Sequence, residues 1–476
     1  MNILGNRKIY RLMIYIVAII SIILLSIYLP EKIIIMLIGT VLTILVFRYI
    51  YISDERLLFA AIFAAILSNF LRQYISISSY LPQLFLLVIV IKIFDNIVIK
   101  KKQFKINKVI GITVVLMVLL DMVTVCFSQL NIGSVLFCYA LLRRYAFLIT
   151  LVFVFNSDIN IKTVDKLSKI LTGFVVLNMV YILFQFLSGI RGDYLNGLFG
   201  YKANGIVLQS LSIILVLYIC NYESGIIKRF KTISTVGLLS LYVVYCTIAE
   251  VKFGYIVLPI IFILNLMDSK RKLYNAVLIG VIVVALNIGY VNLVKLYPNM
   301  DFANTKYLES YLTGSYNNTN TINRFGYMET FRKTVLTDDT KLLIGNGLGS
   351  ANEGISTEAL TGPLNKEFGF MQINWFSIPY MIVENGIVGL ILFISIYIYI
   401  LFKSLKDWVI KRDRLSIVVN MITVISIVFL FYNNQMTNIY SMIFLVWFYI
   451  SVYLKESIAS KSVKENLLNG KETIRD

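Results

Sequence analysis

Apolar runs of roughly 20 residues recur along most of this chain, and they constrain its fold more than any other feature. A helix of that length crosses the hydrocarbon core of a bilayer, which is about 30 Å thick. Hydrophobic residues make up 58% of the chain and charged residues 15%, a balance far more apolar than that of soluble domains. The sequence therefore predicts an all-α polytopic integral membrane protein.

Run length predicts about fourteen transmembrane helices. We expect helices 1–11 within residues 1–295, a large extracytoplasmic loop with short helices at 296–375, helices 12–14 within 376–454, and a cytoplasmic tail at 455–476. The predicted spans are 11–29, 33–52, 56–71, 80–98, 109–128, 134–156, 167–188, 205–221, 232–249, 252–267, 273–295, 376–402, 415–432 and 437–454.

The net charge of +18 is better explained by membrane topology than by nucleic-acid binding. If both termini are cytoplasmic, most of the 44 Lys and Arg residues fall on the inner side, as the positive-inside rule requires. The short outer loops then hold only Lys32, Arg72, Arg191, Lys202 and Lys252. We therefore expect both termini inside and no nucleic-acid partner.

The four cysteines lie inside apolar runs and suit core packing rather than a disulfide frame or a metal site. The chain has no histidine, which removes the commonest general base at neutral pH.

Charged residues within predicted spans are costly and are usually paired or functional. Asp121 and the pair Arg143 and Arg144 fall at similar depth, roughly 11–15 Å from the outer ends of their spans. We predict that Asp121 pairs with one of the two arginines. The pair is either purely structural, or the spare arginine faces a water-filled cavity and meets an anionic ligand.

Two outer segments are unusually polar for turns between spans. "IAEVKFG" places Glu250 and Lys252 at the bilayer edge, where snorkelling explains the lysine but not the glutamate. "RGDYLNGLFGYKANG" carries Arg191, Lys202 and Asn204 among glycines. This second segment is either ordinary turn chemistry or a site for an oligosaccharide or a phosphate.

The large loop contains "NRFGYMETFRKTVLTDDTKLLIGNGLGS". A helix that begins near Ile322, capped by Asn320 or Thr321, would place Arg324 on its apolar stripe and Arg332 beside that stripe. An arginine at a packing position needs an anionic partner, either a ligand or a glutamate of the loop. "GNGLG" reads as a tight turn that brings the backbone close to another segment. Glu384 and Asn385 of the following run are expected to lie submerged near the outer face.

The ordered set "GLFGYKANG", "IAEVKFGYIVLP", "NRFGYMETFRKT", "LLIGNGLGS" and "ENGIVGLILF" resembles the O-antigen polymerase and ligase superfamily, the Wzy-type polymerases of O-antigen, capsule and exopolysaccharide. The resemblance covers roughly residues 190–405. It implies a GT-C-like glycosyltransferase of the bacterial cytoplasmic (inner) membrane. Ligases of the superfamily carry a histidine near the start of the re-entering helix, where this chain reads "INWFSIP", and this favours a polymerase.

The resemblance implies transfer of a growing glycan from a polyprenyl-pyrophosphate (undecaprenyl-type) carrier to a lipid-linked oligosaccharide repeat unit on the outer face. It implies no metal and no cofactor, and it makes arginines the holders of the pyrophosphate. Its expected partners are the lipid-linked oligosaccharide, membrane lipid, and the flippase and chain-length regulator of the same pathway.

Guanidinium groups suit the leaving pyrophosphate because they are permanently charged and bidentate. The residues assigned to catalysis or substrate binding are Arg324 first, then Arg191 and Arg332, with Lys202, Asn204 and Lys252 assisting. The candidates for the base that deprotonates the acceptor hydroxyl are Glu250 first, then Asp193 or Glu384, and positioning without a strong base is also open. The rival functions are a lipid-linked oligosaccharide flippase or transporter, an O-antigen-type ligase, and a structural partner in an envelope complex.

Overall fold

The computed structural model describes residues 45–128, 130–201, 203–220, 231–266, 272–298, 322, 325–354, 357–411, 413–438 and 440–472. The chain divides into two units, residues 1–58 and 59–476. In the first unit a helix covers residues 45–52, and the guanidinium of Arg56 lies 3.9 Å from the centre of the Tyr49 ring. All other contacts given below lie within the second unit.

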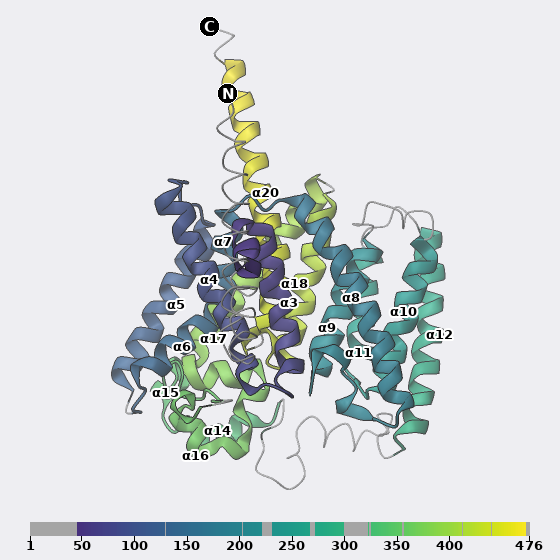
Figure 1. The fold of residues 1–476 in the computed structure, drawn as a ribbon, viewed down its shortest axis with the longest axis horizontal. Helices are drawn as coiled ribbons and strands as arrows, with labels where there is room; N and C mark the ends of the chain where they lie inside the picture. The colour runs from purple at the N-terminus through teal and green to yellow at the C-terminus, as the bar shows by residue number, and fades with distance from the viewer. Residues whose placement is uncertain are drawn as a thin grey trace, which may run out of the picture. The chain divides into compact units, whose positions relative to one another are not determined.

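The described chain is built of helices, without a strand, and most of these helices follow the predicted apolar runs to within a few residues (Figure 1). The long helices are α3 (Asp54–Leu71), α4 (Leu81–Phe94), α5 (Lys108–Phe127), α6 (Ser134–Arg144), α7 (Ala146–Phe155), α8 (Ile161–Leu187), α9 (Asn204–Ile219), α10 (Lys231–Ile248), α11 (Gly254–Leu266), α12 (Lys272–Leu296), α17 (Ser377–Lys411), α18 (Arg414–Tyr432) and α20 (Tyr440–Glu472). Short helices of the polar segments are α14 (Tyr327–Thr334), α15 (Asp339–Ile344), α16 (Pro363–Phe368) and α19 (Gln435–Asn438).

Seven of the described helices are long and apolar enough to cross a membrane, and the count rises to eight if the bent pair α6 and α7 forms one span. Three shorter apolar helices lie within α9, α10 and α11. The chain is therefore a helical membrane protein. The first predicted span, 11–29, and most of the second, 33–52, lie outside the described residues.

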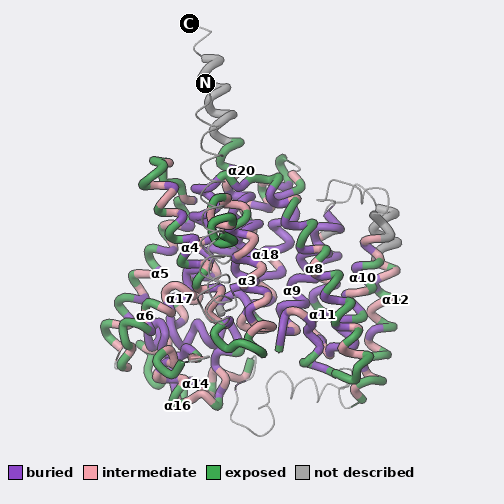
Figure 2. Tube along the Cα trace, viewed as in Figure 1, coloured by how far each residue is buried: buried purple, intermediate pink, exposed green. Residues whose placement is uncertain are grey.

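Burial separates the central helices from the peripheral ones (Figure 2). Of the 18 most apolar consecutive residues, 72% are buried inside the protein in α18 and in α20, whereas only 17% are buried in α12. Since all three helices are apolar, the exposed side chains of α12 face the surrounding lipid and α18 and α20 form the core of the bundle.

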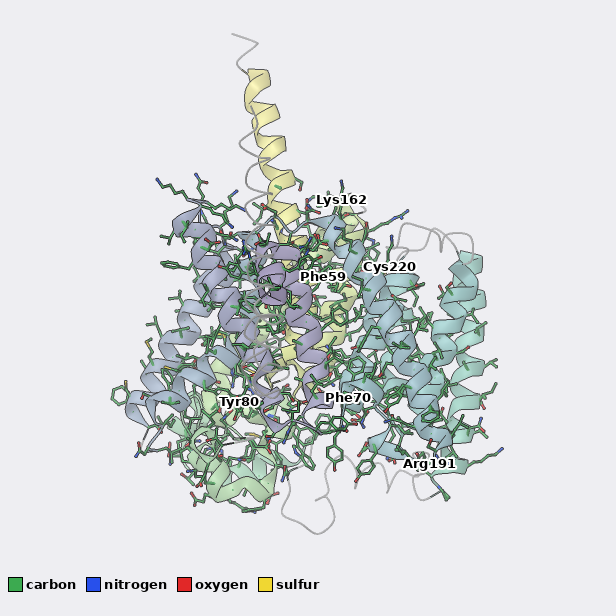
Figure 3. All side chains as sticks on the ribbon, viewed as in Figure 1. Phe59, Phe70, Tyr80, Lys162, Arg191 and Cys220 are labelled. Carbon is green, nitrogen blue, oxygen red and sulfur yellow. The ribbon has the colours of Figure 1, made fainter. Side chains whose placement is uncertain are left out.

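The long helices run between two ends of the bundle, where the loops gather (Figures 1 and 3). We call the end that carries Arg191 and α14–α16 the loop end, and the opposite end, which carries Lys162 and residues 99–107, the basic end. The segment from Lys100 to Lys108 alone places five lysines near the basic end.

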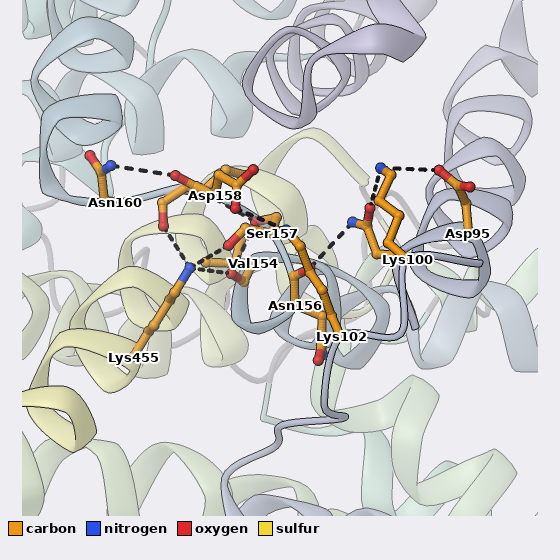
Figure 4. A network of polar contacts seen from close by, with 11 residues as sticks. Asp95, Lys100, Lys102, Val154, Asn156, Ser157, Asp158, Asn160 and Lys455 are labelled. Carbon is orange, nitrogen blue, oxygen red and sulfur yellow. Dashed lines mark hydrogen bonds and ion pairs between the residues drawn. The ribbon is translucent and has the colours of Figure 1, made fainter. Parts of the chain in front are cut away.

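A polar network ties helices together at the basic end (Figure 4). The ammonium group of Lys455 on α20 donates hydrogen bonds to the carbonyl oxygens of Val154, Ser157 and Ile159, at 3.1, 2.6 and 2.8 Å. Helix termini leave carbonyl groups without partners inside the helix. Lys455 therefore satisfies the end of α7 and fixes it to α20.

Two of the predicted spans are broken rather than continuous. The span predicted at 134–156 is divided at Tyr145 into α6 and α7, which meet at a bend of 54°. The span predicted at 376–402 extends to Lys411 and is kinked at Gly386, where φ is 66° and ψ is −173°. Hydropathy gives the length of an apolar run but does not reveal such breaks.

The turn at residues 345–349, "GNGLG", fits against the kink of α17. The backbone N–H groups of Asn346 and Gly347 donate to the carbonyl oxygens of Val383 and Glu384, at 2.9 and 3.0 Å. These carbonyls precede the break at Gly386, where the helix can no longer satisfy them. The turn therefore replaces the hydrogen bonds that the kink removes.

Gly386 should be essential for this joint. A Cβ at residue 386 would overlap the backbone carbonyl of Leu343, and the φ of 66° with extended ψ is accessible essentially to glycine alone. We expect Gly386→Ala to lower the free energy of unfolding by at least about 3 kcal/mol. Thermal unfolding in detergent, followed by tryptophan fluorescence, measures this change.

The matched control is Gly173→Ala on the exposed face of α8, where an added Cβ meets nothing within 4 Å. Alanine has the higher helix propensity, so this variant should be neutral or more stable by about 0.5–1 kcal/mol. Equal melting temperatures for the two variants would show that the kink does not require glycine.

Candidate functional site

A cluster of charged and polar side chains, buried except for the partly exposed Arg143, joins the two broken helices. We call it the arginine cluster: Asp121, Arg143, Arg144, Tyr145, Glu384 and Asn385. The guanidinium of Arg144 and the carboxylate of Glu384 form an ion pair at 2.7 Å, with side chains 2% and 0% exposed. The Gly349 N–H also donates to Glu384, at 3.1 Å. Arg144 ends α6 and Glu384 lies two residues before the kink, so the pair connects one break to the other.

The predicted pairing of Asp121 with Arg143 or Arg144 is wrong in its partner. Asp121 accepts hydrogen bonds from the Tyr145 hydroxyl and from the Asn385 amide, while Arg144 pairs with Glu384. The depth argument did place the three groups in one cluster. It did not identify Glu384 as the partner of Arg144, because Glu384 belongs to a helix far along the chain. Hydropathy does not fix where that helix starts.

The second group of polar residues lies at the loop end. We call it the carboxylate cluster: Gly192, Asp193, Asn204, Glu250, Lys252 and Tyr297. It combines the loop between α8 and α9, the turn between α10 and α11, and the residue that follows α12. Among the predicted site residues, the structure brings together Asn204, Glu250 and Lys252.

Glu250 occupies an unusual backbone position. Its φ of 59° is left-handed, and the Val251 N–H donates to the Cys246 carbonyl at 2.9 Å. This is the bond of a Schellman motif, in which the left-handed residue after the helix is usually glycine because a Cβ is unfavourable there. The chain thus accepts a local cost to place a carboxylate at this turn.

Neighbouring groups hold the Glu250 carboxylate in place. Its Oε1 lies 3.2 Å from the Lys252 ammonium, and a Cβ at Gly192 would lie 3.5 Å from its Oε2. The Tyr297 hydroxyl donates to the Ile248 carbonyl at 2.8 Å and accepts from the Gly192 N–H at 3.0 Å. Tyr297 therefore fixes the α8–α9 loop against the end of α10, which brings Gly192 beside the carboxylate.

Asp193 and Asn204 form the exposed side of the cluster. The Asn204 amide donates to the Asp193 carboxylate at 2.6 Å, and the Tyr245 hydroxyl donates to the Asn204 carbonyl at 3.2 Å. These bonds fix the orientation of a carboxamide and a carboxylate at the rim. Such groups hydrogen bond to sugar hydroxyls, which both donate and accept.

Burial raises the pKa of Glu250 above its ordinary value, while Lys252 acts in the opposite direction and Asp193 reinforces the rise. Burial likewise raises the pKa of the Tyr297 hydroxyl. A carboxylate whose pKa is raised towards the working pH is a stronger base than an ordinary glutamate. The cluster therefore has the electrostatics of a proton acceptor.

Arg191 lies beside this cluster without joining it (Figure 3). Its guanidinium donates to the carbonyl oxygens of Phe186 and Ile190 and lies 4.1 Å from the centre of the Phe186 ring. The side chain is exposed and is folded onto the end of α8.

The remaining predicted site residues are Arg324 and Arg332 on the large loop and Lys202 on the α8–α9 loop. Arg332 forms an exposed ion pair with Asp339 at 2.9 Å. Arg324 and, on the α8–α9 loop, Lys202 lie outside the described residues. The predicted helix start near Ile322 is wrong: Phe325 and Gly326 form a turn, and α14 begins at Tyr327 because glycine caps a helix more readily than it continues one.

The sequence analysis missed the roles of Tyr297 in the carboxylate cluster and of the Asn385 amide in the arginine cluster, and it missed Asn352, which contacts Arg143. Tyr297 was detectable in principle, since it ends an apolar run and directly precedes Pro298, a position typical of an interfacial anchor. Asn352 had no such signal, because its contact with Arg143 depends on how the turn at residues 345–349 docks.

No protein-family model matches the chain, and no curated protein matches it.

The buried ion pair should be tightly coupled. We expect Glu384→Met and Arg144→Met each to destabilise the protein by about 3–5 kcal/mol, because each leaves an uncompensated buried charge. The double variant should lose less stability than the two single variants added together, by at least about 1 kcal/mol. Chemical denaturation in detergent measures the cycle.

The same cycle on the exposed pair Glu329 and Lys333 of α14, joined at 2.6 Å, serves as the control and should show a coupling of no more than about 0.5 kcal/mol. Additive losses at Arg144 and Glu384 would mean that the two side chains do not stabilise each other.

Proposed function

We propose that the protein is a polysaccharide polymerase, an integral-membrane glycosyltransferase that lengthens a glycan on a polyprenyl-pyrophosphate carrier at the outer face of the bacterial cytoplasmic membrane. In this proposal the loop end faces outward, both termini are cytoplasmic, and about fourteen spans surround the site. One observation carries the proposal: Glu250 occupies a position that favours glycine, and its half-buried carboxylate lies beside Lys252 at the loop end.

The chemistry requires one base and one set of cations. The acceptor hydroxyl loses its proton to the Glu250 carboxylate, and its oxygen forms a bond to C1 of the donor sugar. The bond from C1 to the pyrophosphate breaks, and the lipid pyrophosphate leaves with the electron pair. Cations near the leaving oxygen stabilise the developing negative charge.

The residues assigned to the leaving group are Arg324 first, then Arg191 and Arg332, with Lys252 or Lys202 assisting. Lys252 is the one with the clearest placement, 3.2 Å from the base. An ammonium group at this position holds Glu250 ionised and also favours an anionic substrate nearby. Asn204 and Asp193 at the rim suit hydroxyl groups of the acceptor sugar.

The motif order supports the same proposal. Asn204 of "GLFGYKANG" donates to Asp193, whose charge acts on Glu250 of "IAEVKFG", and "GNGLG" docks on the kink of "ENGIVG". Segments distant in sequence are thus paired, and both pairs lie towards the loop end. A flippase needs an alternating pathway, but it has no comparable need for a strained carboxylate at an outer turn.

Purified protein in detergent, supplied with a lipid-linked repeat unit and a metal chelator, should build a ladder of longer glycans. We expect Glu250→Gln and Glu250→Gly to abolish the ladder, because both remove the base. Glu250→Gly should also be more stable than Glu250→Gln by about 1 kcal/mol, since glycine adopts the left-handed φ without strain.

Lys333→Gln, which alters an exposed pair on α14, should leave the ladder unchanged. A ladder of normal length from Glu250→Gly would remove Glu250 from the mechanism. Transfer of glycan to a different acceptor without repetition would identify a ligase, and movement of substrate across vesicles without a new bond would identify a flippase.

The acid limb of the pH–rate profile should report the ionisation of Glu250. The ionised form is the base, so the rate should rise as pH rises through the pKa of the folded protein, which burial places above the ordinary value. Lys252→Gln removes a charge that lowers this pKa, so the limb should move to higher pH. Asp193→Asn removes a charge that raises it, so the limb should move to lower pH.

Lys252→Arg keeps the charge and should leave the limb close to that of the wild-type protein. If Lys252→Gln lowers the maximal rate but leaves the limb in place, Lys252 acts on the substrate alone and the titrating base is another group.

A further inference from the structure

Arg143 is a membrane-embedded cation without an acidic partner. Its Nη1 donates to the side-chain oxygen of Asn352 at 2.7 Å, and its Nε is buried with no hydrogen-bond partner. Among the described residues, no carboxylate lies within 4.0 Å of its guanidinium. An arginine in this environment normally meets an anion, because neutral amides do not offset the cost of removing the charge from water.

The two nearby carboxylates are already committed to other donors. Glu384 accepts from Arg144 and from the Gly349 N–H. Asp121 accepts from the Tyr145 hydroxyl and the Asn385 amide. A small rearrangement that gave Arg143 a carboxylate would therefore break an existing ion pair or hydrogen bond.

Further donors near Arg143 lack partners as well. Arg144 Nη1, the Tyr440 hydroxyl and the Ser350 hydroxyl are buried and unsatisfied within the described chain. Their residues are 4%, 6% and 0% exposed. Such atoms are rare in folded proteins once ordered water and bound groups are counted as partners, so several donors in one cluster are open to water or to a bound anion.

These donors belong to the same region of the fold. Tyr440 and Tyr380 lie close enough to Arg143 to interact with it electrostatically, as does Tyr139. Ser350 belongs to the same turn as Gly349 and Asn352, which contact Glu384 and Arg143. The unsatisfied groups therefore come from α6, the start of α20 and the large loop.

The backbone at this place supports a ligand site. Arg143 and Arg144 form the last turn of α6 at the break, and Glu384 lies beside the kink of α17. Both breaks lie roughly 14–17 Å from the loop-end starts of their helices, at 1.5 Å per residue. Broken helices at membrane depth occur where the backbone is enclosed by protein or surrounds a bound ion or substrate.

We infer that Arg143, with Arg144 Nη1 and the Tyr440 hydroxyl, binds one oxyanion of the phosphate class. The guanidinium fork matches two oxygens of such a group, and the tyrosine hydroxyl supplies a third donor. This site shares no residue with the carboxylate cluster and does not require that the protein transfer sugars. The phosphate can come from a lipid headgroup or from free phosphate, and the two sources are separated experimentally below.

The probe for free phosphate is inorganic phosphate added to purified full-length protein in phosphate-free detergent, with the melting temperature followed as a function of concentration. The probe for a lipid source is the same protein in phosphate-free detergent micelles with or without added phosphatidylglycerol. A rise in melting temperature with inorganic phosphate indicates the free anion. A rise only with the anionic lipid indicates the headgroup.

Two variants connect either response to the site. Arg143→Gln should weaken the apparent affinity by about tenfold or more, the effect of losing a hydrogen-bonded charge. Tyr440→Phe removes only a hydroxyl that lacks a partner, so it should fold normally and still weaken binding severalfold. Tyr449→Phe, on the same helix, loses a hydroxyl that Ser168 already partners at 3.0 Å and should bind as the wild type does.

The inference is overturned if neither probe raises the melting temperature of the wild-type protein. It is equally overturned if Tyr440→Phe and Arg143→Gln respond to the effective probe with unchanged affinity. The inference is supported if Tyr440→Phe and Arg143→Gln lose affinity for the effective probe and Tyr449→Phe does not.

Discussion

The ion pair between Arg144 and Glu384 is the interaction on which the loop end of this protein depends. Two opposite charges with almost no exposure are tolerated only when each is also hydrogen bonded, because the desolvation cost of the pair is not offset by attraction alone. The Gly349 N–H supplies part of that compensation to Glu384. Since Gly349 belongs to the large loop, folding of the loop and burial of the pair are coupled.

This coupling explains why so apolar a chain maintains a long polar segment between α12 and α17. The described part of that segment is fixed to the bundle mainly through backbone groups. Asn346 and Gly347 satisfy carbonyls at the kink, and Asn352 holds Arg143. Backbone donors need no particular side chain, but they need close approach, and this accounts for glycine at residues 345 and 386, where a Cβ would overlap the opposing main chain.

Much of the helical frame follows from the sequence, because an apolar run of membrane length has one stable form in lipid. The predicted run at 109–128 and the observed α5 at Lys108–Phe127 differ by one residue at each end. Contacts between distant segments do not follow in this way. Depth along a helix placed Asp121 near the two arginines, yet the partner of Arg144 comes from α17. The predicted start of the helix near Ile322 was wrong for a local reason. The apolar periodicity extends across Gly326, whereas α14 begins only after that glycine.

Three features depart from what stability alone favours. Glu250 stands in a left-handed conformation, Arg143 has no counter-ion among the described residues, and two spans are broken. Departures from local conformational and electrostatic preferences occur chiefly at functional or strained sites. The strained carboxylate and the unpaired arginine also have opposite charge and separate supporting residues, so a mutation can remove one and leave the other. The proton acceptor proposed at the loop end and the anion site proposed beside the broken helices therefore rest on separate residues, and each can be tested without the other.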